Sequence, residues 1–367
     1  MRIYKNEVLN ALKKISSFIS PSGVSPVLGC TMFNFKSDKL RLMGTNLESY
    51  YYNDINLENN NDPQISLTID TKIATNIIST FTAEFINIKI DTAASTITFS
   101  ANDAELSASY MSADDFPAWF AAENLKPILK LDDKNIFITA VNAVKHCPLK
   151  GDESKPAFNG IHVNITDSYV FVEATDGKRA ARAKYANAGN AAGSYIVPPA
   201  LFENIPEKTA LEISSDGVFI GFNAGSECFY TRLIDGKFPD LNAVLPKDHK
   251  IKVEIGASKM SEHIKFVEAV AKDNSYSVKF SFSKSGVKLS AAAKTNKAKS
   301  EYKEAVCDGD LDINFNAKYF RETLTALQNE KATLKFSGSQ APVHVTEEKD
   351  GVEYEHILMP VRPAFTA

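Results

Sequence analysis

The chain has 367 residues, of which 44% are apolar and 23% are charged. This length exceeds what one hydrophobic core normally serves, so we expect two or three domains, and the composition excludes a disordered or fibrous chain. The formal net charge of −4 excludes a protein that binds nucleic acid by being basic throughout, so a nucleic-acid role would require positive charge segregated on one surface.

The first residues, MRIYKNEVLNALKKISSFI, show helical spacing without the unbroken apolar stretch of a signal peptide. No later run approaches the ~20 apolar residues of a membrane helix, so we expect a cytoplasmic protein without a membrane partner. The cysteines are widely spaced and form no C-x-x-C pair, which predicts reduced thiols rather than a zinc site or a disulfide framework. They are Cys30, Cys147, Cys228 and Cys307.

The chain repeats one order of elements three times. Each third is expected to open with a helix, at 5–19, 134–145 and 258–272, and to continue later with a strand, a second helix and a β-meander. The strand–helix pairs are ISLTIDTKIATNIISTF, SYIVPPALFENI and LDINFNAKYFRETLTAL, with helix starts marked by Thr71, Pro198-Pro199 and Asn316. The meanders occupy 86–111, 210–234 and 332–358.

An aromatic or apolar residue followed by proline closes each third. Phe116-Pro117, Phe238-Pro239 and Met359-Pro360 lie 122 and 121 residues apart. Because proline lacks an N–H donor, each pair should end sheet pairing and begin a stiff connector. We therefore predict an α+β protein of three repeated domains, 1–125, 126–249 and 250–367, each with two helices and about eight strands; the alternative is that an α+β chain yields such segments by chance.

Basic residues recur on the polar faces of the expected helices. In the first helix Val8, Leu12 and Ile15 form the apolar stripe, and Lys13 lies opposite. Lysine on an exposed helix face is ordinarily only solubilising, but helices lining one surface would give a positive surface that attracts phosphate without reading bases. The candidate lining residues are Lys13, Lys72, Lys145, Lys265, Lys272, Lys318 and Arg321.

Five blocks of sequence carry a family resemblance. They are PVLGCTMFNFKSDKLRLMGTNLE (26–48), AFNGIHVNI (157–165), VEATDGKRAA (172–181), RLIDGKFPDLNAVLP (232–246) and HILMPVR (356–362). Together, in this order, they resemble the bacterial DNA sliding clamp, the β subunit of DNA polymerase III. The resemblance implies a non-catalytic processivity factor: a homodimeric ring of six similar domains that encircles duplex DNA without regard to sequence and tethers the polymerase III catalytic subunit, the clamp loader and other replication and repair proteins.

The resemblance also implies a pocket for a short peptide bearing Gln and Leu or Phe. Many relatives carry His and Leu where this chain has Lys178 and Ala180, so its peptide preference is expected to differ. The mapped residues are Phe158, Thr175, Gly177, Lys178, Arg179, Ala180, Pro239, Val244, Gln340, Pro342, Ile357 and Met359.

Two further expectations follow from the resemblance. The loop SPSGV (20–24), where some relatives place a DNA-contacting Arg, has no basic residue, so Lys150 and Lys155 become the better DNA-contact candidates. Ring closure needs edge strands, for which we expect 105–110 and 277–282, with Leu106 and Val270 as apolar contacts.

The alternative classes of function are an enzyme and a scaffold that binds only proteins. A hydrolase could use Asp176 with Asp235 or Asp240 as metal ligands, and His146 beside Cys147 could suggest a thiol nucleophile, but no motif supports either site. We expect no catalytic residue, no metal and no cofactor. A β-rich scaffold that binds only proteins, without encircling DNA, would keep the pocket and lack the basic lining.

Overall fold

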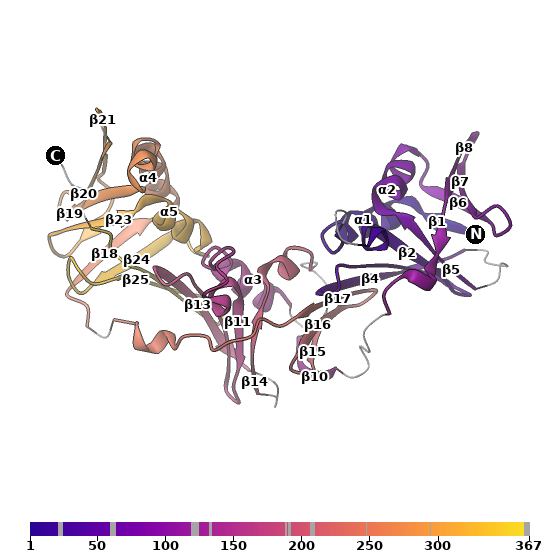
Figure 1. Ribbon diagram of the computed structural model, residues 1–367. Helices are drawn as coiled ribbons and strands as arrows, with labels where there is room; N and C mark the ends of the chain where they lie inside the picture. Colours follow the sequence, from indigo (N-terminus) through magenta and orange to yellow (C-terminus); the bar gives the residue numbers. More distant parts are fainter. Residues whose placement is uncertain are drawn as a thin grey trace. The chain divides into compact units, whose positions relative to one another are not determined.

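A computed structural model of the protein describes residues 1–20, 25–58, 64–118, 125–131, 134–187, 189, 192–205, 210–246, 248–293 and 295–362. They form two compact units (Figure 1). The first comprises Met1–Lys134 and Ala200–Leu233, and the second Asn135–Pro199 and Ile234–Ala367. The middle third of the chain is thus divided between the units, and the predicted limits 1–125, 126–249 and 250–367 stay a prediction.

The first unit contains a nine-stranded and a four-stranded antiparallel sheet (Figure 1). In spatial order the larger sheet is β10 (Lys126–Leu131), β15 (Leu211–Ser215), β16 (Phe219–Ala224), β17 (Glu227–Arg232), β4 (Ser49–Asn56), β3 (Lys39–Thr45), β2 (Cys30–Phe35), β5 (Ile65–Asp70) and β9 (Met111–Ser112). The smaller is β1 (Arg2–Tyr4), β6 (Phe85–Asp91), β7 (Thr96–Ala101) and β8 (Ala104–Ser109).

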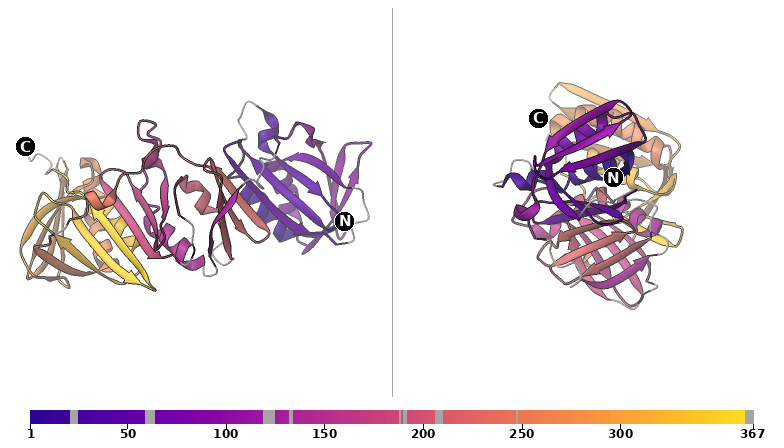
Figure 2. Two further views of the ribbon diagram at one scale, coloured as in Figure 1. Left: turned by 90° about the horizontal axis from the view of Figure 1, so that it is seen from below. Right: turned by 90° about the vertical axis from the view of Figure 1, so that its right-hand side faces the viewer.

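The second unit repeats this plan, and Figure 2 shows its yellow strands running beside magenta strands from the middle of the chain. The nine-stranded sheet is β14 (Gly193–Val197), β11 (Ile161–Ile165), β12 (Tyr169–Thr175), β13 (Arg179–Ala186), β26 (Val352–Leu358), β25 (Val343–Lys349), β24 (Lys331–Phe336), β18 (Ile251–Gly256) and β22 (Val306–Cys307). The four-stranded sheet is β21 (Asn296–Tyr302), β20 (Gly286–Ala293), β19 (Ser277–Ser283) and β23 (Leu311–Asn316).

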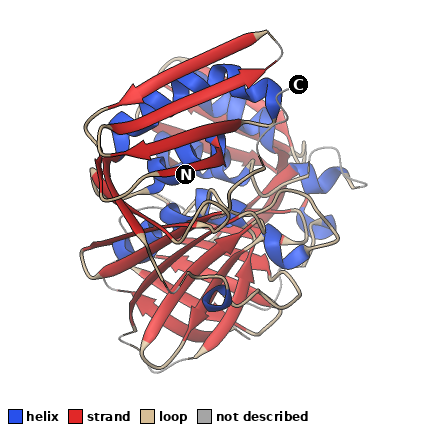
Figure 3. Ribbon diagram, turned by 90° about the vertical axis from the view of Figure 1, so that its left-hand side faces the viewer, coloured by secondary structure: helices blue, strands red, loops and turns tan. Residues whose placement is uncertain are grey.

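Helices pack against these strands, as the blue and red ribbons of Figure 3 show. Asp70 and Asn316 cap the helices that begin at Thr71 and Ala317, since their side chains accept hydrogen bonds from the backbone of Ile73 (2.9 Å) and Tyr319 (3.0 Å). The cap at Asp70 lies one residue before the predicted Thr71. The helices are α1 (Lys5–Ile15), α2 (Thr71–Thr80), α3 (Lys134–Val144), α4 (Ala257–Ala271) and α5 (Ala317–Ala326).

The second helix predicted in the middle third is wrong as an α-helix. The structure has only a short 3-10 turn there, Pro199–Glu203. The sequence places Pro206 directly after Ile205, and a proline disfavours helical geometry at the residue before it. Proline therefore bounds this segment on both sides and leaves no room for a full helix.

One turn design recurs at residues 45–49, 175–179 and 215–219. In each, the hydroxyl of Thr45, Thr175 or Ser215 donates to the backbone carbonyl four residues later and accepts from the backbone N–H two residues later. The side chain of the next residue, an Asn or Asp, accepts hydrogen bonds from the backbone N–H groups two and three residues after it. The same turn thus occurs once in the first third and twice in the middle third of the chain.

An aromatic cluster fills the core of the last third. Phe280 is fully buried; its ring stacks on Phe320 with centroids 4.9 Å apart and meets the edge of Phe315 at 5.7 Å. Phe280 lies on β19, Phe315 on β23 and Phe320 on α5, so the cluster fixes the helix against the small sheet.

Truncating Phe280 should destabilise this part of the chain. We expect Phe280→Ala to lower the free energy of unfolding by about 3–5 kcal/mol, because it removes buried apolar area and leaves a cavity. Val306→Ala, at a position 65% exposed in the same third, should cost less than about 0.5 kcal/mol. Urea unfolding followed by circular dichroism would measure both, and equal losses would contradict the assigned core.

Candidate functional site

The turn between β12 and β13 is rigidly built. Gly177 has φ +83°, a left-handed conformation that favours glycine. Thr175 Oγ1 donates to the carbonyl of Arg179 (2.6 Å) and accepts from the N–H of Gly177 (3.0 Å). The Asp176 carboxylate accepts from the N–H groups of Lys178 (2.8 Å) and Arg179 (2.9 Å). The backbone of the ATDGKR block is therefore held in one conformation by hydrogen bonds within the turn.

Strand pairing brings the end of the chain onto this turn. β13 and β26 pair antiparallel with Ala180 opposite Ile357, and the N–H of Met359 donates to the carbonyl of Lys178 (2.9 Å). β25 lies on the other side of β26, with Val343 opposite Leu358. Because Gln340 and Pro342 directly precede β25, the strand register places their segment next to the end of β26.

An apolar cluster lies beside the turn. Ala157, Ala180, Phe238, Leu241 and Ile357 are buried in it, and Phe158 packs against it. A small hollow opens next to this cluster, lined by Ala180, Ala181, Arg182, Leu241, Leu245, Glu355 and Ile357. Strand pairing already ends with β17 at Arg232, so Phe238-Pro239 does not itself end it as predicted. Pro239 follows Phe238 in the connector, and the chain then turns through the short 3-10 segment η6 (Leu241–Ala243).

Two large apolar side chains near the hollow stay exposed. Val244, which follows η6, is 52% exposed, and Met359, which follows β26, is 43% exposed. We call the hollow together with Val244 and Met359 the docking surface. The predicted pocket residues thus belong to segments that adjoin one another. Thr175, Arg179, Ala180 and Ile357 are buried; Phe158, Pro239 and Pro342 are half-buried; Gly177, Lys178, Val244, Gln340 and Met359 are exposed.

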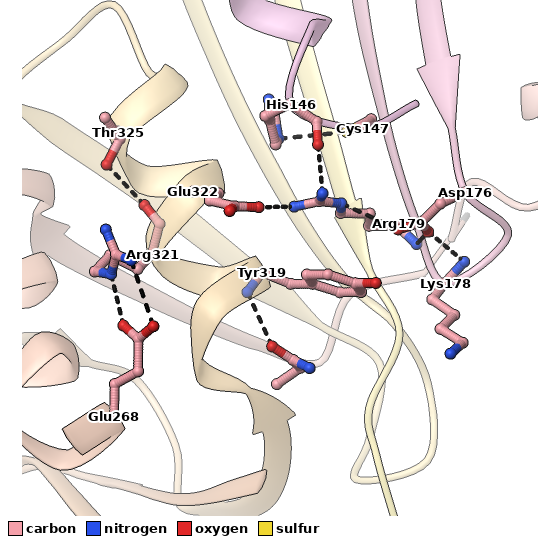
Figure 4. Close-up of polar contacts among 11 residues, drawn as sticks. His146, Cys147, Asp176, Lys178, Arg179, Glu268, Tyr319, Arg321, Glu322 and Thr325 are labelled. Atoms are coloured by element: carbon pink, nitrogen blue, oxygen red, sulfur yellow. Dashed lines mark hydrogen bonds and ion pairs between the residues drawn. The ribbon is translucent and has the colours of Figure 1, made fainter. Parts of the chain in front are cut away.

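The guanidinium of Arg179 binds other residues of the same chain (Figure 4). Its guanidinium lies 3.2 Å from the Asp176 carboxylate, pairs with Glu322 of α5 and donates to the carbonyl of His146. It also covers the ring of Tyr319 at 4.0 Å and is only 8% exposed. Arg179 therefore anchors the turn to α5 and to the end of α3, which leaves Lys178 as the exposed cation of the turn.

The predicted lining residues are exposed with one exception. Arg321 is half-buried and forms an ion pair of 2.6 Å with Glu268 of α4 (Figure 4), so its charge is compensated and it is a weaker phosphate ligand than predicted. Lys13 and Lys72 lie in the first unit and the others in the second. The exposed residues are Lys13, Lys72, Lys145, Lys150, Lys155, Lys265, Lys272 and Lys318; residues 21–24 of the loop SPSGV lie outside the described residues.

Only the first of the two expected edge strands lies at the edge of its sheet. Leu106 lies on β8, the last strand of its sheet, and is 40% exposed. The segment 277–282 is wrong as an edge, because β19 is hydrogen-bonded to both β20 and β23. The edge strands of this sheet are β21 and β23. The sequence of β21, NKAKSEY, has too few apolar residues to indicate a strand.

A second apolar patch adjoins β21, and sequence analysis missed its main residue. Phe266 on α4 is 62% exposed and lines a surface hollow with the half-buried Val270. Phe266 is an aromatic residue on the polar face of a helix between Lys265 and Val267, which is a signal that could have found it. The full lining is Glu262, Lys265, Phe266, Ala269, Val270, Lys297, Ala298 and Lys299.

Two of the carboxylates considered for catalysis accept backbone hydrogen bonds. Asp176 accepts bonds within its turn, and Asp240 caps η6 by accepting from the N–H of Asn242 (2.9 Å). Burial raises the pKa of the Cys147 thiol, which leaves it protonated, and lowers the pKa of His146 well below its usual range. Among the residues that the structure describes, no three His, Cys, Asp or Glu side chains gather as metal ligands, and no helix is long and apolar enough to cross a membrane.

The structure is that of an α+β protein in which each of two units combines a nine-stranded with a four-stranded antiparallel sheet. Models of the DNA polymerase III β subunit match its N-terminal domain at 1–120, its central domain at 132–240 and its C-terminal domain at 242–362. The chain belongs to this family, the bacterial β sliding clamps, whose members are processivity factors without catalytic activity of their own.

Individual relatives resemble the chain along nearly its whole length. The β sliding clamp of Chlamydia muridarum is 25% identical over 98% of both chains, and that of Caulobacter vibrioides is 23% identical over 99% of both. Among solved structures, the β subunit of Streptococcus pyogenes superimposes with a TM-score of 0.89 at 19% identity, over 98% of this chain and 99% of that one. The sliding clamp of Bacillus subtilis gives 0.88 at 17% identity, over 98% of both chains.

A buried histidine behind the docking surface should make stability depend on pH. His356 is fully buried on β26, and burial, together with the charge of His344, lowers its pKa from 6.5 to about 4. Between these values the unfolded chain takes up a proton that the folded chain does not, so stability falls as the pH falls from about 6.5 towards 4.

We expect His356→Phe to remove part of this loss, at most about 3 kcal/mol at 1.36 kcal/mol per pKa unit. Urea midpoints of both proteins at pH 7, 6 and 5 would measure the difference. Parallel curves would show that His356 is not buried in its neutral form.

Proposed function

We propose that this chain is a sliding clamp: two copies close into a ring around duplex DNA, and the docking surface tethers the polymerase III catalytic subunit, the clamp loader and other proteins through a short peptide. The observation that carries the proposal is a strand junction used twice within the chain and left open a third time. A protein that works on chromosomal DNA in a bacterium would act in the cytoplasm, which stays a prediction.

The two complete junctions share one arrangement. β17, the last strand of the second meander, pairs antiparallel with β4, and β26, the last strand of the third meander, pairs in the same way with β13. β4 and β13 are each the third strand of a β2–β3–β4 or β11–β12–β13 hairpin series. Each nine-stranded sheet is completed by these pairings.

The open junction consists of β8 and β21. β8 ends the first meander as β17 and β26 end theirs, and β21 is the third strand of the series β19–β20–β21. Both are the last strands of their sheets. Pairing β8 of one copy with β21 of another would satisfy both edges and close after two copies. Glu105 on β8 and Lys297 and Lys299 on β21 give these strands opposite charges.

Disrupting β8 should therefore yield single chains. We expect the wild type to sediment at twice the 40.3 kDa of one chain, and Leu106→Arg to shift the mass towards 40.3 kDa, because it places a cation against a lysine-rich strand. The control is Leu47→Arg, the same change at a leucine 49% exposed on a turn. Sedimentation velocity at micromolar concentration would decide, and a dimer that tolerates Leu106→Arg would contradict β8 as the interface.

The docking surface suits a short peptide with apolar anchors. Its backbone is fixed by the turn at 175–179, and it combines exposed apolar side chains with a shallow depression. A leucine or phenylalanine inserted there would be stabilised by roughly 25 cal/mol for each Å² of apolar area removed from water. A few such anchors commonly dominate a small interface. Lys178 adds a positive charge on the rim.

A charge at Met359 should abolish peptide binding. We expect Met359→Asp to weaken binding of a labelled peptide carrying Gln, Leu and Phe by at least about tenfold, because the carboxylate would be desolvated by the apolar anchor. The matched control is Met111→Asp, since Met111 is 49% exposed and lies in the first unit. Fluorescence anisotropy would measure both, and equal affinities for wild type and Met359→Asp would place the docking surface elsewhere.

A further inference from the structure

The segment 238–245 carries the predicted pocket residue Pro239 and, in the docking surface, Val244. Two polar side chains of the large sheet, His162 and Arg182, contact this segment. The ring of Phe238 stacks on His162 of β11, with centroids 4.5 Å apart and planes 20° apart. At the other end, Asn242 Oδ1 accepts a hydrogen bond of 2.9 Å from the guanidinium of Arg182 on β13. Both ends of the segment thus depend on side chains of the large sheet.

One buried carboxylate orients both of these side chains. Glu173 on β12 is 5% exposed; its Oε1 accepts from Arg182 Nε at 2.6 Å, and its Oε2 lies 2.9 Å from His162 Nδ1. The His162 ring is also fixed at Nε2 by the hydroxyl of Ser194 (2.9 Å). A buried carboxylate is tolerated only when it is paired in this way, and a fully satisfied network of this kind is rigid.

Arg182 has two further neighbours, and neither replaces its hydrogen bond to Asn242. Glu355 of β26 lies 3.5 Å from the guanidinium and itself pairs with His344 of β25 at 3.2 Å. The ring of Phe171 lies 5.4 Å from the guanidinium carbon. Arg182, Glu355 and Leu245 all line the hollow, so the network lies directly under the docking surface.

We propose that Arg182, oriented by Glu173, is a positioning residue for peptide binding: it holds Asn242 and thereby fixes η6 and the place of Val244, without itself contacting the peptide. This inference rests on the proposed docking function. Pre-organising a loop in its bound conformation increases affinity by reducing the entropy lost on binding. Buried Phe238 and Leu241 and the Asp240 cap already hold this connector, and the contact of Arg182 with Asn242 restrains η6 further.

Asn242 offers a mild test because its side chain is exposed and its loss leaves Glu173 paired. Asn242→Ala should weaken binding of the labelled Gln/Leu/Phe peptide by between about threefold and tenfold, the range of one ordinary hydrogen bond. Asn242→Asp keeps an acceptor for Arg182 and should restore near wild-type affinity. In an Arg182→Lys background, Asn242→Ala should cost nothing further, since both changes remove the same contact.

Anisotropy titrations of these variants beside Met359→Asp, with thermal unfolding as a fold control, separate the outcomes. Loss in Asn242→Ala, rescue by Asn242→Asp and non-additivity with Arg182→Lys at an unchanged unfolding temperature support the positioning role. If Met359→Asp fails to bind while Asn242→Ala binds like wild type, the positioning role is wrong and the docking surface stands. If Met359→Asp binds like wild type, the proposed docking function fails, and this inference with it.

Discussion

Strand edges impose the constraint on which the rest of this protein depends. An edge strand presents unpaired N–H and C=O groups, and a soluble chain must pair, cover or charge them. Here the last strand of one meander completes the sheet of the preceding repeat, as β17 does for β4 and β26 for β13. The same solution applied to β8 and β21 requires a second chain, so assembly follows from the repeat itself.

The docking surface lies at the same strand junction. Pairing of β26 with β13 brings Met359 to the carbonyl of Lys178 and Ile357 opposite Ala180, so residues nearly 180 positions apart share one surface. The junction also buries Glu173 and Arg182, which must be paired with each other. Through Arg182 the same network also contacts Asn242 of the exposed segment 238–245.

Local patterns in the sequence predicted much of this arrangement. Gly177 in its turn, the cap at Asn316 and Leu106 on an edge strand were all predicted, because each depends on a few adjacent residues. The polar contacts were not. Arg321 and Glu268 are 53 positions apart, and Arg179 and Glu322 are 143 apart, so no local pattern reveals that they pair. The edge at β21 was missed because its lysines, which suit an exposed edge, also resemble a loop.

The central claim is that the chain holds DNA by encircling it, and retention on circular versus linear DNA tests this most directly. The chain would be loaded by its clamp loader onto a nicked circular duplex, separated by gel filtration, and examined again after the circle is cut once with a restriction enzyme. The chain is expected to elute with the intact circle and to be lost after cutting, because an otherwise sequence-independent ring slides off free ends. Equal retention on circular and linear DNA would show that the chain binds DNA by contact alone and would contradict the ring.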